Sequence, residues 1–258
     1  MSLAAITSAI NRRLPWWAGP IAIVTALTLF TFYSLWVVFF QSHAATYQTP
    51  EGINYLSPFY SPYIPSPWEW LSPAVFILWI PLGFRATCYY YRKAYYRAFF
   101  WDPPACSDDA QRKEPREPES YRGERAAPWI FNNIHRYFFY GSIIIVTFLA
   151  IEAVLAMFPV DGGFALPLGA LILLINAILL GGYTFGCHSF RHLIGGRLDC
   201  YSCFKGGGAL RKLYKGVSKL NARHATWAWA SLFSVVFADI YLRLVIAQII
   251  SDPILFRI

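Results

Sequence analysis

Hydrophobic residues occur along the chain in blocks long enough to cross a lipid bilayer, and polar residues are concentrated between these blocks. A transmembrane helix needs about 20 predominantly apolar residues to cross a hydrocarbon core of ~30 Å. The pattern predicts an all-α integral membrane protein in which five transmembrane helices form a bundle, over residues 20–41, 72–91, 134–158, 166–187 and 224–249. Pro81 lies inside the second predicted helix and is expected to kink it.

The two long hydrophilic segments between these helices differ in composition. Residues 101–128 are rich in Pro, Glu and Arg and show no apolar period, which predicts an extended cytoplasmic linker. Residues 188–223 are basic, with apolar and aromatic residues interleaved, which predicts a loop that docks on a partner protein or on anionic lipid. Neither segment has the pattern of a second folding unit, so residues 1–258 are predicted to form a single membrane domain.

The distribution of lysine and arginine predicts the orientation in the membrane. The segments 1–19, 85–97, 102–136 and 188–223 contain two, four, six and eight of these residues, which is 20 of the 22 in the chain. The connections 42–71 and 159–167 contain none. Because cytoplasmic loops carry the excess of basic residues, the N-terminus is predicted to be cytoplasmic and the C-terminus outside. Only 14% of the residues are charged, against about 25% in soluble domains, which supports a multi-pass protein.

Soft metal ligands occur at the cytoplasmic ends of four of the five predicted helices. Cys88 lies at the end of the second helix and His135 at the start of the third. Cys187 lies at the end of the fourth helix and His224 at the start of the fifth. Inward-facing side chains at one level of a bundle form a site in its core. The sequence therefore predicts a metal site that is assembled from four helices.

Two thiolates and two imidazoles suit three kinds of centre. A Rieske-type [2Fe–2S] cluster takes two cysteines on one iron and two histidines on the other, and this stoichiometry matches the inter-helix set. Haem b would use only the two histidines and leave both cysteines unexplained. Zinc accepts two cysteines and two histidines. A local zinc site beside Cys187 is an alternative, with ligands drawn from His188, His192, Cys200 and Cys203. Otherwise the last two cysteines are expected to be free thiols, since a cytoplasmic location disfavours disulfides.

Four stretches within residues 83–233 carry a family pattern: GFRATCYYYRKAYYRAFFWDPPAC, NIHRYFFYGSIIIVTFLAIEAV, GCHSFRHLIGG and NARHATWAWASLF. Together with the five spans and the basic cytoplasmic face, they resemble the cytochrome-b-type membrane anchor of the succinate dehydrogenase and fumarate reductase family. Within that family the chain is most similar to the actinobacterial single-anchor type.

The resemblance implies a function and partners. It implies the membrane subunit of a succinate:quinone oxidoreductase in a bacterial plasma membrane. A flavoprotein subunit with its own dicarboxylate site and an iron–sulfur subunit would be its partners, and menaquinone its substrate. Di-haem anchors of the family use four histidines at both membrane depths, whereas the only outer-side histidine here is His43. Two haems therefore do not fit, and an iron–sulfur cluster is preferred to a single haem between His135 and His224. The alternatives are a b-type cytochrome of another respiratory reductase and a zinc-stabilised membrane protein without redox activity.

Quinone reduction requires an apolar slot with a few polar groups. Arg85 lies one turn from the cysteine of the second helix, and aromatic and basic residues lie at the same predicted face. The predicted quinone residues are Arg12, Trp16, Trp17, Arg85 and Tyr89. The aromatic members also fit an ordinary interfacial belt, and Arg85 also fits a side chain that snorkels to headgroups.

Two acidic residues are predicted to lie in the outer half of the membrane. Glu152 is 17 residues beyond His135 and Asp239 is 15 residues beyond His224, hence about 25 and 22 Å along their helices. Arg243 lies one turn from Asp239. Two interpretations remain open: a structural ion pair between Asp239 and Arg243, or a second quinone site or proton path that also includes Glu152.

Overall fold

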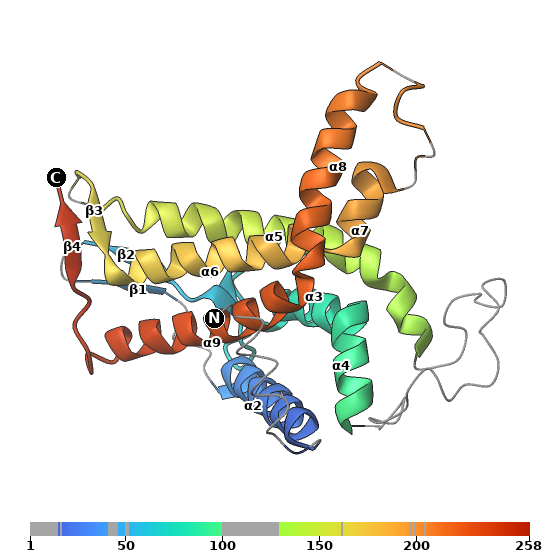
Figure 1. Cartoon of the computed structure of the whole chain (residues 1–258). Helices are drawn as coiled ribbons and strands as arrows, with labels where there is room; N and C mark the ends of the chain where they lie inside the picture. The colour runs from blue at the N-terminus through green and yellow to red at the C-terminus, as the bar shows by residue number, and fades with distance from the viewer. Residues whose placement is uncertain are drawn as a thin grey trace.

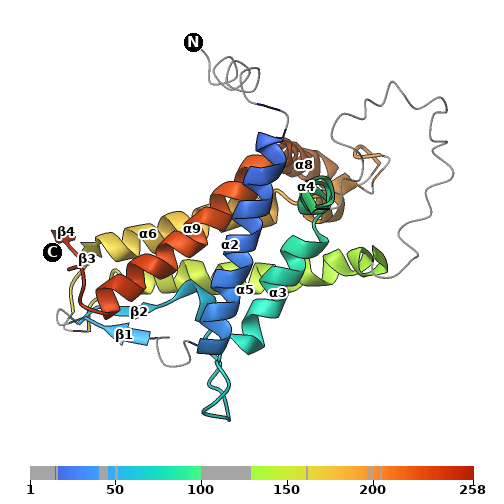
Figure 2. The same ribbon diagram turned by 90° about the horizontal axis from the view of Figure 1, so that it is seen from below.

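A computed structural model describes residues 15, 17–40, 46–49, 52–99, 129–160, 162–196, 198, 200–203 and 205–258. The predicted linker 101–128 and the predicted quinone residues Arg12 and Trp16 lie outside these described residues. Figures 1 and 2 show a bundle of helices with two small sheets at one end.

Four described helices are long and apolar enough to cross a membrane. They are α2 (Ala18–Phe40), the helix that includes α5 (His135–Leu155), α6 (Leu168–Phe185) and α9 (His224–Ile246). Helix α6 packs against both α5 and α9, and α5 also packs against α3 (Val75–Thr87) (Figure 1). The helical membrane architecture predicted from the sequence is confirmed.

The second predicted helix, over residues 72–91, differs from the structure. Cys88 has an extended backbone (φ −64°, ψ 128°) and separates α3 from α4 (Tyr89–Phe99). The 13 residues of α3 extend only about 20 Å at ~1.5 Å per residue. Helix α4 turns away from the direction of α3, as Figure 2 shows. Its basic residues, such as Arg92 and Lys93, explain why it does not continue as a membrane span.

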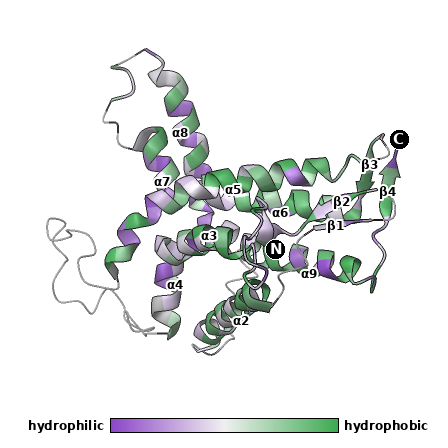
Figure 3. Ribbon diagram, turned by 180° about the vertical axis from the view of Figure 1, so that it is seen from behind, coloured by the Kyte–Doolittle hydropathy of each residue, from purple (hydrophilic) through white to green (hydrophobic). Residues whose placement is uncertain are grey.

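Glycines allow close approach between neighbouring helices. A Cβ atom at Gly83 of α3 would lie 2.4 Å from the ring of Phe138 on α5. A Cβ atom at Gly182 of α6 would lie 2.6 Å from the ring of Trp227 on α9. Small residues at such contacts are typical of helices that pack within a membrane. Most residues along α2, α5 and α6 are hydrophobic, as Figure 3 shows.

The two ends of the bundle have different structures. At one end lie the four helix termini that carry Cys88, His135, Cys187 and His224, and we call it the His–Cys end. At the other, distal end, β1 (Thr46–Gln48) pairs with β2 (Asn54–Leu56), and β3 (Ala165–Pro167) pairs with β4 (Ile254–Arg257), both antiparallel (Figure 1). The sequence pattern did not predict these short strands.

Two features close the distal end. The 3₁₀ turn η1 (Pro58–Tyr60) is buried between α2 and the start of α3. Asp252 accepts hydrogen bonds from the hydroxyls of Tyr55 and Tyr241 and, at 2.9 Å, from the backbone N–H of Gly169. Burial and the bond to Asp252 raise the pKa of the Tyr55 hydroxyl, so it stays protonated and donates. Asp252 thereby ties β2, α6 and α9 together.

The predicted docking loop 188–223 is largely helical. It contains the short helix α7 (His188–Arg191), the π-helical turn η5 (His192–Gly196) and α8 (Gly207–Ala222). Helix α8 projects from the bundle beside α7 (Figure 1). It buries Val217 and exposes basic side chains, and we call the exposed set its basic face: Arg211, Lys212 and Lys215.

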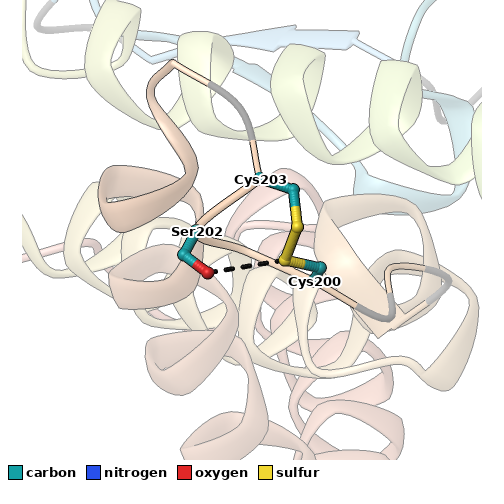
Figure 4. Close-up of a disulfide and its surroundings, with 3 residues drawn as sticks. All are labelled: Cys200, Ser202 and Cys203. Carbon is teal, nitrogen blue, oxygen red and sulfur yellow. Dashed lines mark hydrogen bonds between the residues drawn. A yellow bond between two sulfur atoms is a disulfide. The ribbon is translucent and has the colours of Figure 1, made fainter.

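A disulfide between Cys200 and Cys203 corrects the prediction that these residues are free thiols or metal ligands. Figure 4 shows the bond in the turn between η5 and α8, with the Ser202 hydroxyl 3.4 Å from the sulfur of Cys200. Tyr201 anchors the turn by donating a 2.7 Å hydrogen bond to the carbonyl of Gly195. Both sulfurs are therefore in the disulfide bond, and neither is available as a thiolate ligand for a metal.

Candidate metal centre and adjoining cavities

Breaks in the helices position the four predicted metal ligands. Cys88 is the extended residue between α3 and α4, and Cys187 is the extended N-cap residue of α7, directly after α6. His135 and His224 are the first residues of α5 and α9. The two cysteines are each 2% exposed and belong to one buried cluster. The structure therefore brings the four residues to one end of the bundle core.

The first Cys–His pair consists of Cys187 and His135. The His135 Nε2 atom lies 3.1 Å from the Cys187 sulfur, and its Nδ1 atom lies 2.9 Å from the Thr87 hydroxyl. Thr87 donates its single hydroxyl hydrogen to the carbonyl of Gly83, at 2.7 Å, so it accepts a hydrogen bond from Nδ1–H. The imidazole also stacks on Phe84, with ring centroids 4.8 Å apart. The Nε2 lone pair of His135 is therefore directed towards the thiol.

The second pair consists of Cys88 and His224. The His224 Nε2 atom lies 3.5 Å from the Cys88 sulfur, and the ring stacks on Tyr183 at 4.9 Å. The Nδ1 atom of His224 is buried and has no hydrogen-bond partner among the described residues. Buried polar atoms are normally satisfied, so an unpaired ring nitrogen is an indication of a binding site.

The described donors do not form the ligand set of a single ion. No three Cys, His, Asp or Glu residues of the described part converge on one point, whereas zinc needs four ligands within about 2.0–2.3 Å of one atom. Each of the two close contacts instead joins one thiol to one imidazole.

The alternative local zinc site is not assembled in the described residues. Cys200 and Cys203 are joined in the disulfide. The Nδ1 atom of His192 lies 2.8 Å from a guanidinium nitrogen of Arg136, a donor that competes with a metal. These residues therefore do not converge with Cys187 into one ligand set.

Arg85 is a buried cation next to the second Cys–His pair. Its side chain is 8% exposed, and one guanidinium nitrogen donates to the Tyr91 hydroxyl at 2.7 Å and the Ala228 carbonyl at 3.1 Å. The other nitrogen donates to the Ser231 hydroxyl at 3.0 Å. The guanidinium also lies 4.8 Å from the centre of the Tyr183 ring. Among the described residues, all its hydrogen-bond partners are neutral, so the positive charge of Arg85 is not compensated there.

A cavity of about 440 Å³ opens beside Arg85. It lies between α2, α3, α4 and α9, and its other lining residues are apolar, aromatic or threonine: Leu27, Thr28, Phe30, Thr31, Phe32, Leu82, Ala86, Tyr91, Tyr95, Phe99 and Leu232. Small-molecule sites have this size and this mostly apolar lining with few polar groups. We call it the Arg85 cavity.

Of the three predicted quinone residues that the structure describes, Arg85 alone lines the Arg85 cavity. Trp17 and Tyr89 do not line it and are 48% and 68% exposed. Tyr91 and Tyr95 line it instead, and sequence reasoning missed both. Their spacing of four residues places them on one face of a helix, and this was the signal that could have identified them.

The outer residues predicted from the sequence lie towards the distal end. Asp239 is fully buried and forms an ion pair with Arg243, with an oxygen–nitrogen distance of 2.7 Å. Glu152 lies on α5, and its Oε2 atom is buried without a hydrogen-bond partner in the described part of the chain.

Comparison with known proteins gives two matches that agree. The family model described as actinobacterial succinate dehydrogenase subunit SdhC matches residues 18–248. A chain in the solved structure of the Mycobacterium smegmatis Sdh1 complex in the apo form is 36% identical, with a TM-score of 0.78. That similarity covers 95% of this chain and 92% of the other. A search of curated proteins finds no match.

Proposed function

Because this chain belongs to the family of actinobacterial succinate dehydrogenase subunit SdhC, we propose that it passes electrons from the iron–sulfur subunit of its complex to a quinone. The family makes it a multi-pass plasma-membrane subunit that associates with the other subunits of succinate dehydrogenase. Succinate is oxidised in those other subunits, and the present chain supplies the membrane part of the reaction.

The proposed topology has five membrane segments. They are the four helices of spanning length and the shorter α3, with the His–Cys end in the cytoplasm. The location of 20 of the 22 basic residues supports this orientation. The basic face of α8 lies on the same side and is a suitable surface for the iron–sulfur subunit.

The proposed redox centre is a Rieske-type [2Fe–2S] cluster, which would accept and release one electron at a time at a raised reduction potential. Cys88 and Cys187 would hold it as thiolates, and His135 and His224 through ring nitrogens. Thr87 fixes the tautomer of His135, as outer-shell partners of metal-bound histidines usually do. Haem b is less suitable, because both imidazole Nε2 atoms contact cysteine sulfurs rather than facing an open space.

The proposed quinone site is the Arg85 cavity, with menaquinone as the substrate. One observation carries this proposal: Arg85 is buried without a carboxylate partner in the described residues, lines a cavity of about 440 Å³, and lies three residues from Cys88. A buried positive charge stabilises the negative charge that a quinone gains on reduction. The Tyr91 and Tyr95 hydroxyls donate to the carbonyls of Ala228 and Ala86. Arg85 uses three of its five N–H groups in the described hydrogen bonds, so it is the donor suited to a quinone carbonyl, and the apolar wall of α2 suits the ring and tail.

Spectroscopy and kinetics of the purified native complex test this function. We expect broad iron–sulfur absorption, a paramagnetic signal on reduction, and quinone reductase activity. Arg85→Lys removes the planar guanidinium and should lower quinone turnover at least tenfold, while succinate-dependent reduction of a soluble dye is retained. Arg92→Lys on α4 is the matched control, because the half-buried Arg92 does not line the Arg85 cavity. A complex that contains only haem or zinc contradicts the proposed iron–sulfur cluster. An Arg85→Lys variant with unchanged quinone kinetics contradicts the proposed quinone site.

A further inference from the structure

The distal half of the bundle contains a buried carboxylate that is held by groups from three segments. Asp239 on α9 is 0% exposed. It accepts hydrogen bonds from the hydroxyls of Tyr33 on α2 and Ser57 before η1, and from Arg243 Nε at 2.7 Å. Arg243 balances the charge of this carboxylate, and the two hydroxyls satisfy further lone pairs, as burial of an ion pair requires.

Polar side chains continue from Asp239 along α9 towards Arg85. Ser234 donates to the Asn176 side-chain oxygen on α6 at 2.7 Å, and Ser231 accepts from Arg85 at 3.0 Å. At ~1.5 Å per residue, these serines lie about 7.5 and 12 Å from Asp239 along the helix. The Nδ2 atom of Asn176 is buried and has no partner among the described residues. Polar groups therefore occur at intervals between the Asp239 cluster and the guanidinium that lines the Arg85 cavity.

A second cavity runs between the same two regions. Its volume is about 60 Å³, and it is lined by Pro58 and Phe59 at the distal end and by Arg85 and Tyr183 at the other. Ser142 lines it from α5. The hydroxyls of Ser142 and Tyr183 are buried and have no hydrogen-bond partner in the described part of the chain. One water needs roughly 10–15 Å³ of such volume, so the cavity has room for several waters that would satisfy these hydroxyls.

We propose that the Asp239 cluster, this second cavity and the serines of α9 form a proton path from the outer side of the membrane to the Arg85 cavity. The proposal rests on the quinone function given above. Succinate oxidation in the other subunits releases two electrons and two protons on the cytoplasmic side. The quinone takes those two electrons and, through the path, two protons from outside to become the quinol. Positive charge thus moves through this subunit from the outer side of the membrane towards the cytoplasmic side.

Glu152 is a second acid at the outer end of the path. It lies on α5 in the distal half, with its Oε2 atom buried and without a partner among the described residues. Ser61, which directly follows η1, is its neighbour and is also fully buried. The η1 segment thus connects the two acids, because Ser57 at its start binds Asp239 and Ser61 at its end faces Glu152. An acid in this position suits the transfer of protons from the outer surface.

The test is made with the whole complex in proteoliposomes that present the succinate site outwards and contain a trapped pH indicator. Succinate and a menaquinone analogue are added, and the proton change in the lumen is measured against quinol formed. We expect two protons to leave the lumen for each quinol formed. An uncoupler should abolish the resulting pH change in the lumen. Full quinone turnover without alkalinisation of the lumen would overturn the path and leave the quinone function standing. Absence of quinone turnover in the parent complex would overturn both.

Variants test whether the named residues carry the protons. Asp239→Asn should lower quinone turnover at least tenfold and retain succinate-dependent dye reduction. Asp252→Asn is the matched control, because this half-buried carboxylate likewise accepts hydrogen bonds from two hydroxyls, those of Tyr55 and Tyr241, but does not line the second cavity. Ser142→Val, which fills the cavity and removes a hydroxyl, should also slow quinone turnover and leave dye reduction intact. Unchanged lumenal proton loss and unchanged turnover in both Asp239→Asn and Ser142→Val would refute the assignment.

Discussion

The hydrogen bond between Thr87 and His135 allows the strictest test of the metal centre. Thr87→Val replaces the hydroxyl by a methyl group of similar shape. The variant loses the acceptor 2.9 Å from His135 Nδ1 and the bond to the Gly83 carbonyl. His135 is then free to carry its proton on Nε2, the nitrogen that faces Cys187 at 3.1 Å, and this tautomer cannot bind a metal through Nε2.

The expected magnitude follows from the role of such partners. Loss of an outer-shell hydrogen bond to a metal-bound histidine typically lowers metal affinity 10- to 100-fold, which corresponds to about 1.4–2.8 kcal/mol. The carbonyl of Gly83 remains within its helix, so the loss of the second bond adds little. We therefore expect partial occupancy of the cluster after purification and a shifted signal from the clusters that remain.

The assay compares iron and acid-labile sulfide per complex, the paramagnetic signal and its midpoint potential in Thr87→Val, Thr87→Ser and Thr147→Val. Thr87→Ser keeps the hydroxyl and should behave as the parent. Thr147→Val removes the same kind of bond, from a threonine hydroxyl to a helix carbonyl, at a site on α5 remote from the histidines. If Thr87→Val has the same iron content, signal and potential as Thr147→Val, the assigned tautomer or the assigned ligand is wrong.

Three other predictions concern the metal ligands, the quinone site and the docking surface. Cys88→Ser and Cys187→Ser should each lose the cluster signal while the protein still inserts into the membrane. Cys200→Ser, which removes the disulfide, should leave the metal content unchanged. Equal metal content in all three variants contradicts the assignment of Cys88 and Cys187 as ligands. Tyr91→Phe removes a hydrogen bond to Arg85 worth about 0.5–1.5 kcal/mol, so KM for the quinone should rise roughly two- to tenfold, with dye reduction as the control. Replacing the three residues of the basic face of α8 by Gln should weaken assembly with the iron–sulfur subunit. The effect should be largest at low salt, where the electrostatic attraction in the parent is least screened. Undiminished assembly of the variant at every salt concentration argues against docking on this face.

The long hydrophobic segments were predictable because membrane helices are defined by length and apolarity. The first, third, fourth and fifth predicted spans agree with α2, α5, α6 and α9 to within about three residues at most ends. The positions of the four metal-ligand candidates at one end follow from the same reasoning. Which cysteine contacts which histidine could not be predicted from the sequence. These contacts depend on the rotation of each helix about its axis, which depends on the close packing at Gly83 and Gly182.

Other features depend on tertiary contacts that leave a weak sequence signal. The sequence does not reveal the break at Cys88, because residues 72–91 are mostly apolar and aromatic and only the basic residues that follow indicate where α4 leaves the membrane. The short strands at the distal end are three or four residues long, too short for a period to be recognised. The glycines of residues 188–223 favour a loop, but the structure contains helix α8 there. Gly206 to Gly208 lie at the start of this helix, where Gly206 adopts a positive φ of 93°.

The shortness of α3 has a consequence for the biosynthesis of the protein. A segment of 13 residues that contains Arg85 and Pro81 is poorly suited to partition into the bilayer alone, since a charged residue within a membrane segment costs about 2.5–3.5 kcal/mol at the helix centre. Its principal packing partner is α5, which is synthesised only after the linker 101–128. We therefore expect α3 to wait at the membrane surface or beside α2 until α5 emerges, and to insert together with it. In a Cys106→Ser background, ribosome-bound chains that end before α5 should then show α3 accessible to water-soluble thiol reagents at Cys88, and longer chains should not.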